Sequence, residues 1–134
     1  MAGQCLYQGN SLSCTIYENV AEVCFDNKKA SVNKFDRATL IELREAVNHL
    51  QQQKLSGAYF TSKKEAFLVG ADITEFQSFF KSSDITSWLS STHQLFNDIE
   101  DLPFPTVIAI NGVCLGGGFE LALACSHRIT SSTA

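Results

Sequence analysis

A glycine-rich segment near the end of the chain carries the strongest chemical signal. It covers residues 111–120 and reads NGVCLGGGFE. Three consecutive glycines let the backbone adopt unusual dihedral angles and approach a ligand closely. The helix predicted to follow has unpaired N–H groups and a partial positive charge at its start, which stabilise an anion or an oxygen that gains negative charge. Glu120 lies three residues after Gly117, close enough to share such a pocket.

Other functions of a glycine-rich loop have sequence requirements of their own. A phosphate-binding P-loop needs Gly-Lys followed by Ser or Thr, which this segment lacks. The dinucleotide-binding spacing Gly-x-Gly-x-x-Gly does not fit glycines at positions 112, 116, 117 and 118. A purely structural turn, with Glu120 as a solvated carboxylate in the first helical turn, explains the segment as well as catalysis does.

A second loop favours catalysis. Residues 67–76, FLVGADITEF, run from an apolar extended segment through Gly70 into a helix predicted at 73–80. Asp72 is the expected N-cap of that helix, and Ala71 before it then offers a free backbone N–H. Two loops with one such donor each form a two-donor oxyanion hole if they converge on one oxygen.

Alternating strands and helices are expected to position the two loops. Apolar residues repeat at three- and four-residue steps over residues 37–53, with Asp36 as the N-cap, which is typical of an amphipathic helix. The alternation predicts an α/β fold with crossover connections. Strands are expected at residues 12–16, 20–25, 58–61 (extended over 63–69), 106–110 and 128–130, and further helices at 85–100 and 119–125.

Composition restricts the function classes. The chain has 134 residues and a net charge of −4, which predicts one domain over residues 1–134 and argues against a general nucleic-acid binder. None of the five cysteines has metal-ligand spacing, so no metal site is expected, and all but Cys5 lie in apolar stretches, which predicts buried free thiols and a reducing compartment. No signal peptide or 18-residue apolar run is present, so no membrane span and a cytoplasmic location are expected.

Both loops match a known family. Segments 70–76 (GADITEF) and 111–122 (NGVCLGGGFELA) resemble the signature loops of the crotonase, or enoyl-CoA hydratase/isomerase, superfamily. Segments 31–36 (SVNKFD) and 100–106 (EDLPFPT) are similar to the amino-terminal part of bacterial fatty-acid oxidation complex alpha subunits. The resemblance runs from about Leu6 to the last residue. It implies a crotonase-like (ClpP/crotonase) spiral of ββα units. The strand at the chain end without a covering helix suggests that the chain is an amino-terminal fragment of that fold.

The resemblance also implies site residues and a substrate, a fatty acyl thioester of coenzyme A. The N–H groups of Ala71 and Gly117 would hold the thioester oxygen, and Glu120 would be one of two catalytic glutamates. The second glutamate is expected beyond the chain end, so the isolated chain is expected to be inactive. Substrate contacts are also implied for Gly70, Asp72, Gly116 and Gly118.

Further partners and cofactors follow from the same resemblance. Coenzyme A is part of the substrate, and no cofactor is expected in this piece. An NAD site and a thiolase beta subunit would be associated with the full-length relatives. Many relatives carry a basic residue at the position of Thr74, where it helps to hold a coenzyme A phosphate. Here Lys28, Lys29 and Lys34 are the candidates to compensate.

Alternatives stay open at this point. The chain could be a non-catalytic crotonase-fold module that binds acyl-CoA or a partner chain, and the strand at 128–130 could promote self-association. Another crotonase chemistry, such as thioester hydrolysis, uses the same oxyanion hole. Trp88 is expected in the core or in the wall of an acyl pocket. The three histidines, at 49, 93 and 127, show no nucleophile constellation.

Overall fold

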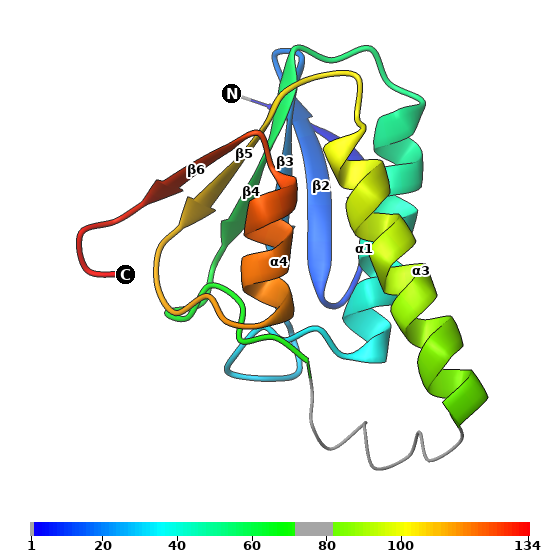
Figure 1. The fold of residues 1–134 in the computed structure, drawn as a ribbon. Coiled ribbons are helices and arrows are strands. Elements are labelled where there is room, and N and C mark those ends of the chain that lie inside the picture. The colour runs from blue at the N-terminus through cyan, green and yellow to red at the C-terminus, as the bar shows by residue number, and fades with distance from the viewer. Residues whose placement is uncertain (1, 72–81) are drawn as a thin grey trace.

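A computed structural model describes residues 2–71 and 82–134. Its six strands form one sheet in the order of the sequence, as Figure 1 shows. The strands are β1 (Gln4–Gln8), β2 (Leu12–Tyr17), β3 (Val20–Phe25), β4 (Gly57–Ser62), β5 (Thr106–Ile110) and β6 (His127–Thr130).

The direction of the strands determines where the loops lie. β1, β2 and β3 pair antiparallel, whereas β3 to β6 pair parallel through the helices α1 (Arg37–Gln51), α3 (Ser82–Glu100) and α4 (Gly117–Ala124). Crossovers between parallel strands are right-handed, so an unbroken strand order puts every crossover helix on the same face. Figure 1 shows the three helices along one side of the sheet. The carboxyl ends of β3, β4 and β5 therefore meet at one edge, together with the loops that follow them.

Aromatic packing forms the centre of the core between sheet and helices. The Phe25 ring lies 6.1 Å from Phe35, 6.4 Å from Phe60 and 6.0 Å from Phe67, measured between ring centroids. Phe35 in turn lies 5.9 Å from Phe96 of α3. Each buried phenylalanine stabilises the fold by about 1.5–3 kcal/mol. One face of α1 packs on this core through Thr39, Leu40, Leu43, Ala46, Val47 and Leu50.

Within the described residues the predicted strands and helices are confirmed, and the main differences are as follows. β1 was not expected, because its residues are mostly exposed and polar and it forms by pairing with β2. The extension over 63–69 is wrong: only Leu68 forms a bridge there, with Cys114, and the segment turns instead, with the Lys64 N–H donating to the Ser62 hydroxyl over 3.0 Å. α1 ends at Gln51, and α4 begins at Gly117. The helix predicted at 73–80 falls outside the described residues.

The cysteines behave largely as the composition predicts. Cys14, Cys24 and Cys125 are buried free thiols and Cys114 is half-buried, while Cys5 is exposed. Burial raises the pKa of Cys14 to about 12 and that of Cys125 to about 11. These two thiols therefore stay protonated at neutral pH and act as small apolar groups.

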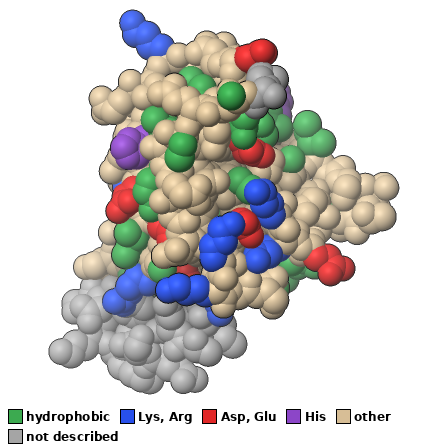
Figure 2. Space-filling model, turned by 180° about the vertical axis from the view of Figure 1, so that it is seen from behind, with side chains coloured by type: hydrophobic (Ala, Val, Ile, Leu, Met, Phe, Trp, Pro, Cys, Tyr) green, Lys and Arg blue, Asp and Glu red, His purple; other side chains and the backbone are tan. Residues whose placement is uncertain are grey.

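Basic and acidic side chains are mixed on the one face that Figure 2 shows. Figure 2 shows acidic side chains among the basic ones on the face seen from behind. One such cluster is Asp26 with Lys28 and Lys64, and the hydrogen bond from Lys28 holds the pKa of the Asp26 carboxyl below its usual value. Within the described part of the chain, no helix has the length and apolar character needed to cross a bilayer.

Glu42 of α1 fastens the first hairpin to the helix layer. Its half-buried carboxylate accepts hydrogen bonds from three backbone N–H groups, of Asn10 at 3.2 Å, Ser11 at 2.9 Å and Leu12 at 3.2 Å. Hydrogen bonds to a charged acceptor are stronger than neutral ones. The β1–β2 connection is therefore held by one side chain.

We expect Glu42→Ala to lower the free energy of unfolding by about 2 kcal/mol, because three N–H groups lose their common acceptor. Urea denaturation measures this as a shift of the midpoint. Glu100→Ala, at the exposed end of α3, serves as the control and should change stability by less than about 0.5 kcal/mol. Equal midpoints for the two variants would show that Glu42 does not fasten the hairpin.

Candidate active site

The loop after β4 is shaped by Gly70. This glycine has φ of 92°, a conformation that side chains rarely adopt. Its carbonyl accepts a hydrogen bond of 2.7 Å from the N–H of Phe35, and Ala71 forms an isolated bridge with the same residue. A Cβ at Gly70 would lie 2.9 Å from the carbonyl oxygen of Leu115. The absence of a side chain therefore lets this loop touch the loop after β5.

A buried asparagine joins the loops at this edge. The side chain of Asn33 donates from Nδ2 to the carbonyl oxygens of Phe25 and Phe67, both at 3.2 Å, and to the hydroxyl of Ser62 at 2.9 Å. Its Oδ1 accepts from the N–H of Asn27 at 2.9 Å. Asn33 thus connects the end of β3, the end of β4 and the start of the Gly70 loop.

The loop after β5 lies directly against the Gly70 loop. The N–H of Leu115 donates to the carbonyl of Leu68 over 3.0 Å, and the N–H of Phe67 donates to the carbonyl of Val113 over 2.9 Å. A Cβ at Gly118 would stand 2.6 Å from the Leu68 oxygen, closer than real contacts allow. Glycine at position 118 is thus required for this contact between the two loops.

At the contact, two backbone N–H groups have no acceptor within residues 2–71 and 82–134. Among the described residues, neither the N–H of Ala71 nor that of Gly117 donates to a protein acceptor. The N–H groups after Gly117 are partly used, since Gly118 donates to Leu115 and Glu120 donates to Gly116. Gly117 is the first residue of α4, so its N–H lies at the positive end of the helix.

One small cavity collects three of the predicted site residues. It has a volume of about 170 Å³, and Ala71, Gly117 and Glu120 all contribute to its wall. The remaining wall is largely apolar and comes from the loop before α1, from α1 and from α3. Its residues are Phe35, Leu40, Trp88, Leu89, Thr92, His93 and Phe96.

The other predicted residues lie elsewhere. Gly70, Gly116 and Gly118 lie at the contact between the loops and are not among the residues that line the cavity, so their contact with substrate stays a prediction. Asp72 and Thr74 fall outside the described residues. Lys28, a candidate for a phosphate contact, is paired with Asp26.

His93 lines the candidate site, which the sequence analysis did not predict. It lies on α3 and lines the same cavity as Glu120. A signal was available, because Leu89, Thr92, His93 and Phe96 follow the i, i+3, i+4, i+7 spacing of one helix face. The cavity therefore holds two groups able to transfer protons, a carboxylate and an imidazole. In the described part of the chain, no three metal-ligating side chains gather.

Solved structures show the class of fold. An enoyl-CoA hydratase/carnithine racemase from Magnetospirillum magneticum aligns with a TM-score of 0.85 over 93% of this chain and 48% of its own, at 22% identity. The enoyl-CoA hydratase from Bacillus anthracis aligns with a TM-score of 0.81 over 92% of this chain and 48% of its own, at 28% identity. The α/β architecture is thus the crotonase fold, and the chain spans about half the length of these structures.

The sequence comparison gives the family. The enoyl-CoA hydratase/isomerase family model matches residues 15–134, and the chain belongs to this family. It is also similar to the fatty acid oxidation complex subunit alpha of Idiomarina loihiensis, with 48% identity over 132 residues. That alignment covers 96% of this chain and 18% of the relative, so the chain spans about a fifth of the relative's length.

We expect Asn33→Ala to cost about 3 kcal/mol of stability, because it leaves the Phe67 carbonyl and the Asn27 N–H without a partner and removes one of the donors to the Phe25 carbonyl. Amide hydrogen exchange should also speed up at Val69, whose N–H donates to the Asn33 carbonyl, and at Leu115.

The matched control is Asn97→Ala on the exposed face of α3, which should shift the unfolding midpoint by less than about 0.5 kcal/mol. Unchanged exchange at Leu115 in Asn33→Ala would mean that the asparagine does not hold the two loops together.

Proposed function

We propose that this chain provides part of an enoyl-CoA hydratase and Δ3-Δ2-enoyl-CoA isomerase site that acts on fatty acyl thioesters of coenzyme A. The observation that carries the proposal is the shared cavity of Ala71, Gly117 and Glu120. The N–H groups of Ala71 and Gly117 act as the oxyanion hole, and Glu120 transfers a proton. The family match supports the reaction class.

The chemistry explains why these groups are needed together. In hydration, a water oxygen attacks C3 of the 2-enoyl thioester, and the double-bond electrons move onto the carbonyl oxygen. Two fixed N–H donors stabilise this charge, and the loss of one such donor raises a barrier by about 2.7–4 kcal/mol. A carboxylate takes the proton of the water, and a proton is delivered to C2.

Isomerisation uses the same groups in a different order. A carboxylate removes a proton from C2 of the 3-enoyl thioester, the double bond moves, and the proton returns at C4. The enolate between these steps again carries its charge on the carbonyl oxygen. Coenzyme A is part of the substrate, and these steps need no other cofactor.

The role in fatty-acid β-oxidation rests on the named relatives. The fatty acid oxidation complex subunit alpha of Psychrobacter cryohalolentis is 44% identical over 133 residues. That alignment covers 18% of the relative's length. We assign any nicotinamide site, any contact with a thiolase beta subunit and the second catalytic glutamate to parts of the protein other than these residues. A cytoplasmic location remains part of the proposal.

A second candidate is a crotonase-fold module that binds a partner chain. Around α4 and β6, large apolar side chains are exposed, and all four residues of β6 are exposed. An open strand edge next to apolar side chains favours association. The exposed apolar residues are Val113, Leu115, Phe119, Leu123 and Ile129.

Replacing the matching segment of the Idiomarina loihiensis subunit with this chain tests the catalytic proposal. We expect the chimera to hydrate crotonyl-CoA, and Glu120→Gln in the chimera to lower kcat by a factor on the order of 10²–10⁴, because the neutral amide cannot accept the proton. KM should change little. The 134-residue chain alone should show little or no turnover.

Glu100→Gln in the same chimera is the control and should leave kcat within about twofold, since a surface change away from the site has little effect. Full activity of the Glu120→Gln chimera would remove Glu120 from the mechanism. The partner-binding alternative would be favoured by two results together. The 134-residue chain would associate with itself, and Glu120→Gln would leave the kcat of the active chimera unchanged.

A further inference from the structure

The helix that carries Gly117 and Glu120 is short and only partly buried. α4 has eight residues, of which Gly118, Leu121 and Ala122 are buried. A helix of this length is not stable in isolation, so the contacts at its two ends decide where it lies. At the amino-terminal end, Gly118 packs against the loop after β4. The position of the helix therefore also depends on what holds its carboxyl end.

Arg128 holds that carboxyl end. Its Nη1 donates one hydrogen bond to the carbonyl of Ala122 and one to the carbonyl of Cys125, each over 3.0 Å. The carbonyls at the end of a helix carry partial negative charge, so a guanidinium is favourable there. Arg128 belongs to β6 and pairs with Ile108 of β5. The side chain thus ties α4 to the sheet at the point where the chain turns from α4 into β6 (Figure 1).

A pair of reciprocal hydrogen bonds strengthens the same end. The N–H of Ser126 donates to the Thr106 hydroxyl over 2.9 Å, and the N–H of Thr106 donates to the Ser126 hydroxyl over 3.0 Å. Thr106 is buried and is the first residue of β5. The carboxyl end of α4 is therefore fastened to two strands, to β5 through Ser126 and to β6 through Arg128.

A small tilt at this end has a large effect at the cavity. With a rise of about 1.5 Å per residue, Gly117 lies roughly 8–12 Å along the helix from the two carbonyls that Arg128 binds. A tilt of about 5° about that end moves the Gly117 N–H by about 1 Å. Oxyanion donors act over a narrow range of about 2.7–3.1 Å, and a misplacement of about 1 Å can cost a factor of about 10² in rate.

We propose that Arg128 is a positioning residue, which fixes the axis of α4 so that the Gly117 N–H and the Glu120 carboxylate keep their places in the cavity. This inference rests on the proposed function of that cavity. Arg128 is not among the residues that line it. Its influence therefore passes through the helix and not through contact with the substrate.

The test uses the active chimera described above. We expect Arg128→Met to lower kcat by about 10–100-fold, because the donor and the carboxylate are misplaced in the transition state, while KM stays within about threefold. Arg128→Lys keeps the charge and enough N–H groups for both carbonyls, so it should restore kcat to within about fivefold of the unmodified chimera. Arg128→Gln is shorter and uncharged and should behave like Arg128→Met. Urea denaturation shows whether each variant is folded.

The bound thioester reports on the oxyanion donors directly. Infrared spectroscopy of isotope-labelled butanoyl-CoA, a saturated analogue that cannot be hydrated, measures the stretching frequency of the thioester carbonyl. N–H donors polarise this bond and lower its frequency. We expect Arg128→Met to shift the frequency back toward that of free butanoyl-CoA. An arginine that only stabilises the fold would leave the frequency unchanged in the folded variant.

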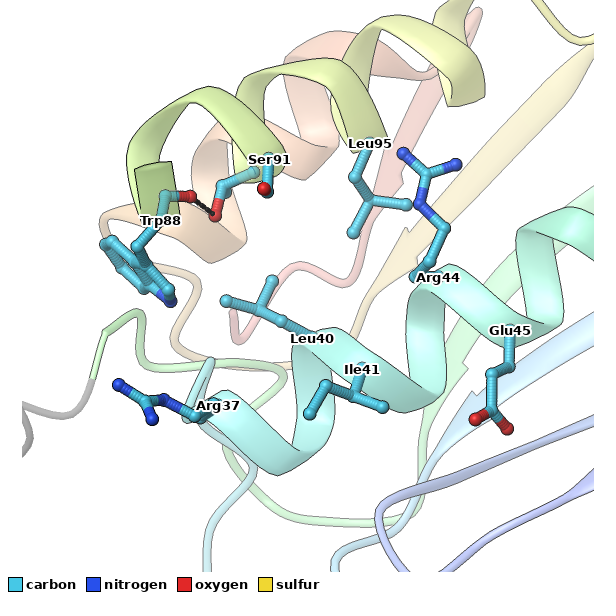
Figure 3. A pocket seen from close by; sticks show the side chains of 9 residues that line it. Arg37, Leu40, Ile41, Arg44, Glu45, Trp88, Ser91 and Leu95 are labelled. Carbon is cyan, nitrogen blue, oxygen red and sulfur yellow. Dashed lines mark hydrogen bonds between the residues drawn. The ribbon is translucent and has the colours of Figure 1, made fainter. Parts of the chain in front are cut away.

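Arg44→Met is the matched control. Figure 3 shows Arg44 beside a cavity of about 350 Å³ between α1 and α3, and its guanidinium donates to the Asp98 carboxylate over 2.7 Å. This variant loses the same charge and a comparable tie between two elements, but it leaves the ties of α4 intact. Its kcat should stay within about twofold of the unmodified chimera.

Four results would overturn the positioning role and leave the proposed function standing. They are a kcat within about twofold in the folded Arg128→Met chimera, an equal fall in kcat in Arg44→Met, a fall in kcat without a change in the carbonyl frequency, and failure of both uncharged variants to fold. Full activity of the Glu120→Gln chimera would overturn the proposed function and this inference with it.

Discussion

The candidate site depends on the hydrogen bonds of the Asn33 side-chain amide. It is buried, yet both its nitrogen and its oxygen have partners, from the end of β3, the end of β4 and the loops that follow them. Parallel strands bring three loops to one edge, but strand pairing stops before the loops begin. A side chain with both donors and an acceptor can satisfy the backbone there in a way that an apolar residue cannot. The Asn33 side chain, which lies in the loop after β3, thus helps to fix the loop after β4 that carries Ala71.

The site also requires the loop after β5 to lie very close to its neighbours, and glycine allows this because it has no side chain. A Cβ at Gly117 would lie 2.8 Å from the Phe35 ring, and one at Gly112 would lie 2.0 Å from the Glu65 carbonyl oxygen. A side chain at Gly112 would push the loops after β4 and β5 apart, and one at Gly117 would collide with the Phe35 ring. Gly117 also lines the small cavity and leaves the start of α4 without a side chain there. Packing and chemistry therefore impose the same residue type.

Much of this was predictable from the sequence because periodicity and glycine spacing are local signals. Helix α1 follows from Leu40, Leu43, Val47 and Leu50, and β5 from a run of Thr, Val and Ile residues that only Ala109 interrupts. β1 was not predictable, since its exposed polar residues form a strand only when β2 is already in place. The cavity between α1 and α3 was also out of reach, because it depends on how these two helices pack together, which no local pattern encodes.

Helical geometry links the two chemical roles assigned to α4. Gly117 and Glu120 are three residues apart, so they lie on the same side of the helix with a rise of about 4.5 Å between them. The Glu120 N–H donates to Gly116, so the first turn is regular and this offset is fixed. An oxygen held at the Gly117 N–H therefore places the next carbons of an acyl chain alongside the first turn, where the carboxylate lies. If the oxyanion forms there, the position of the base relative to the substrate follows from the helix itself, and α3 has only to close the cavity from the other side.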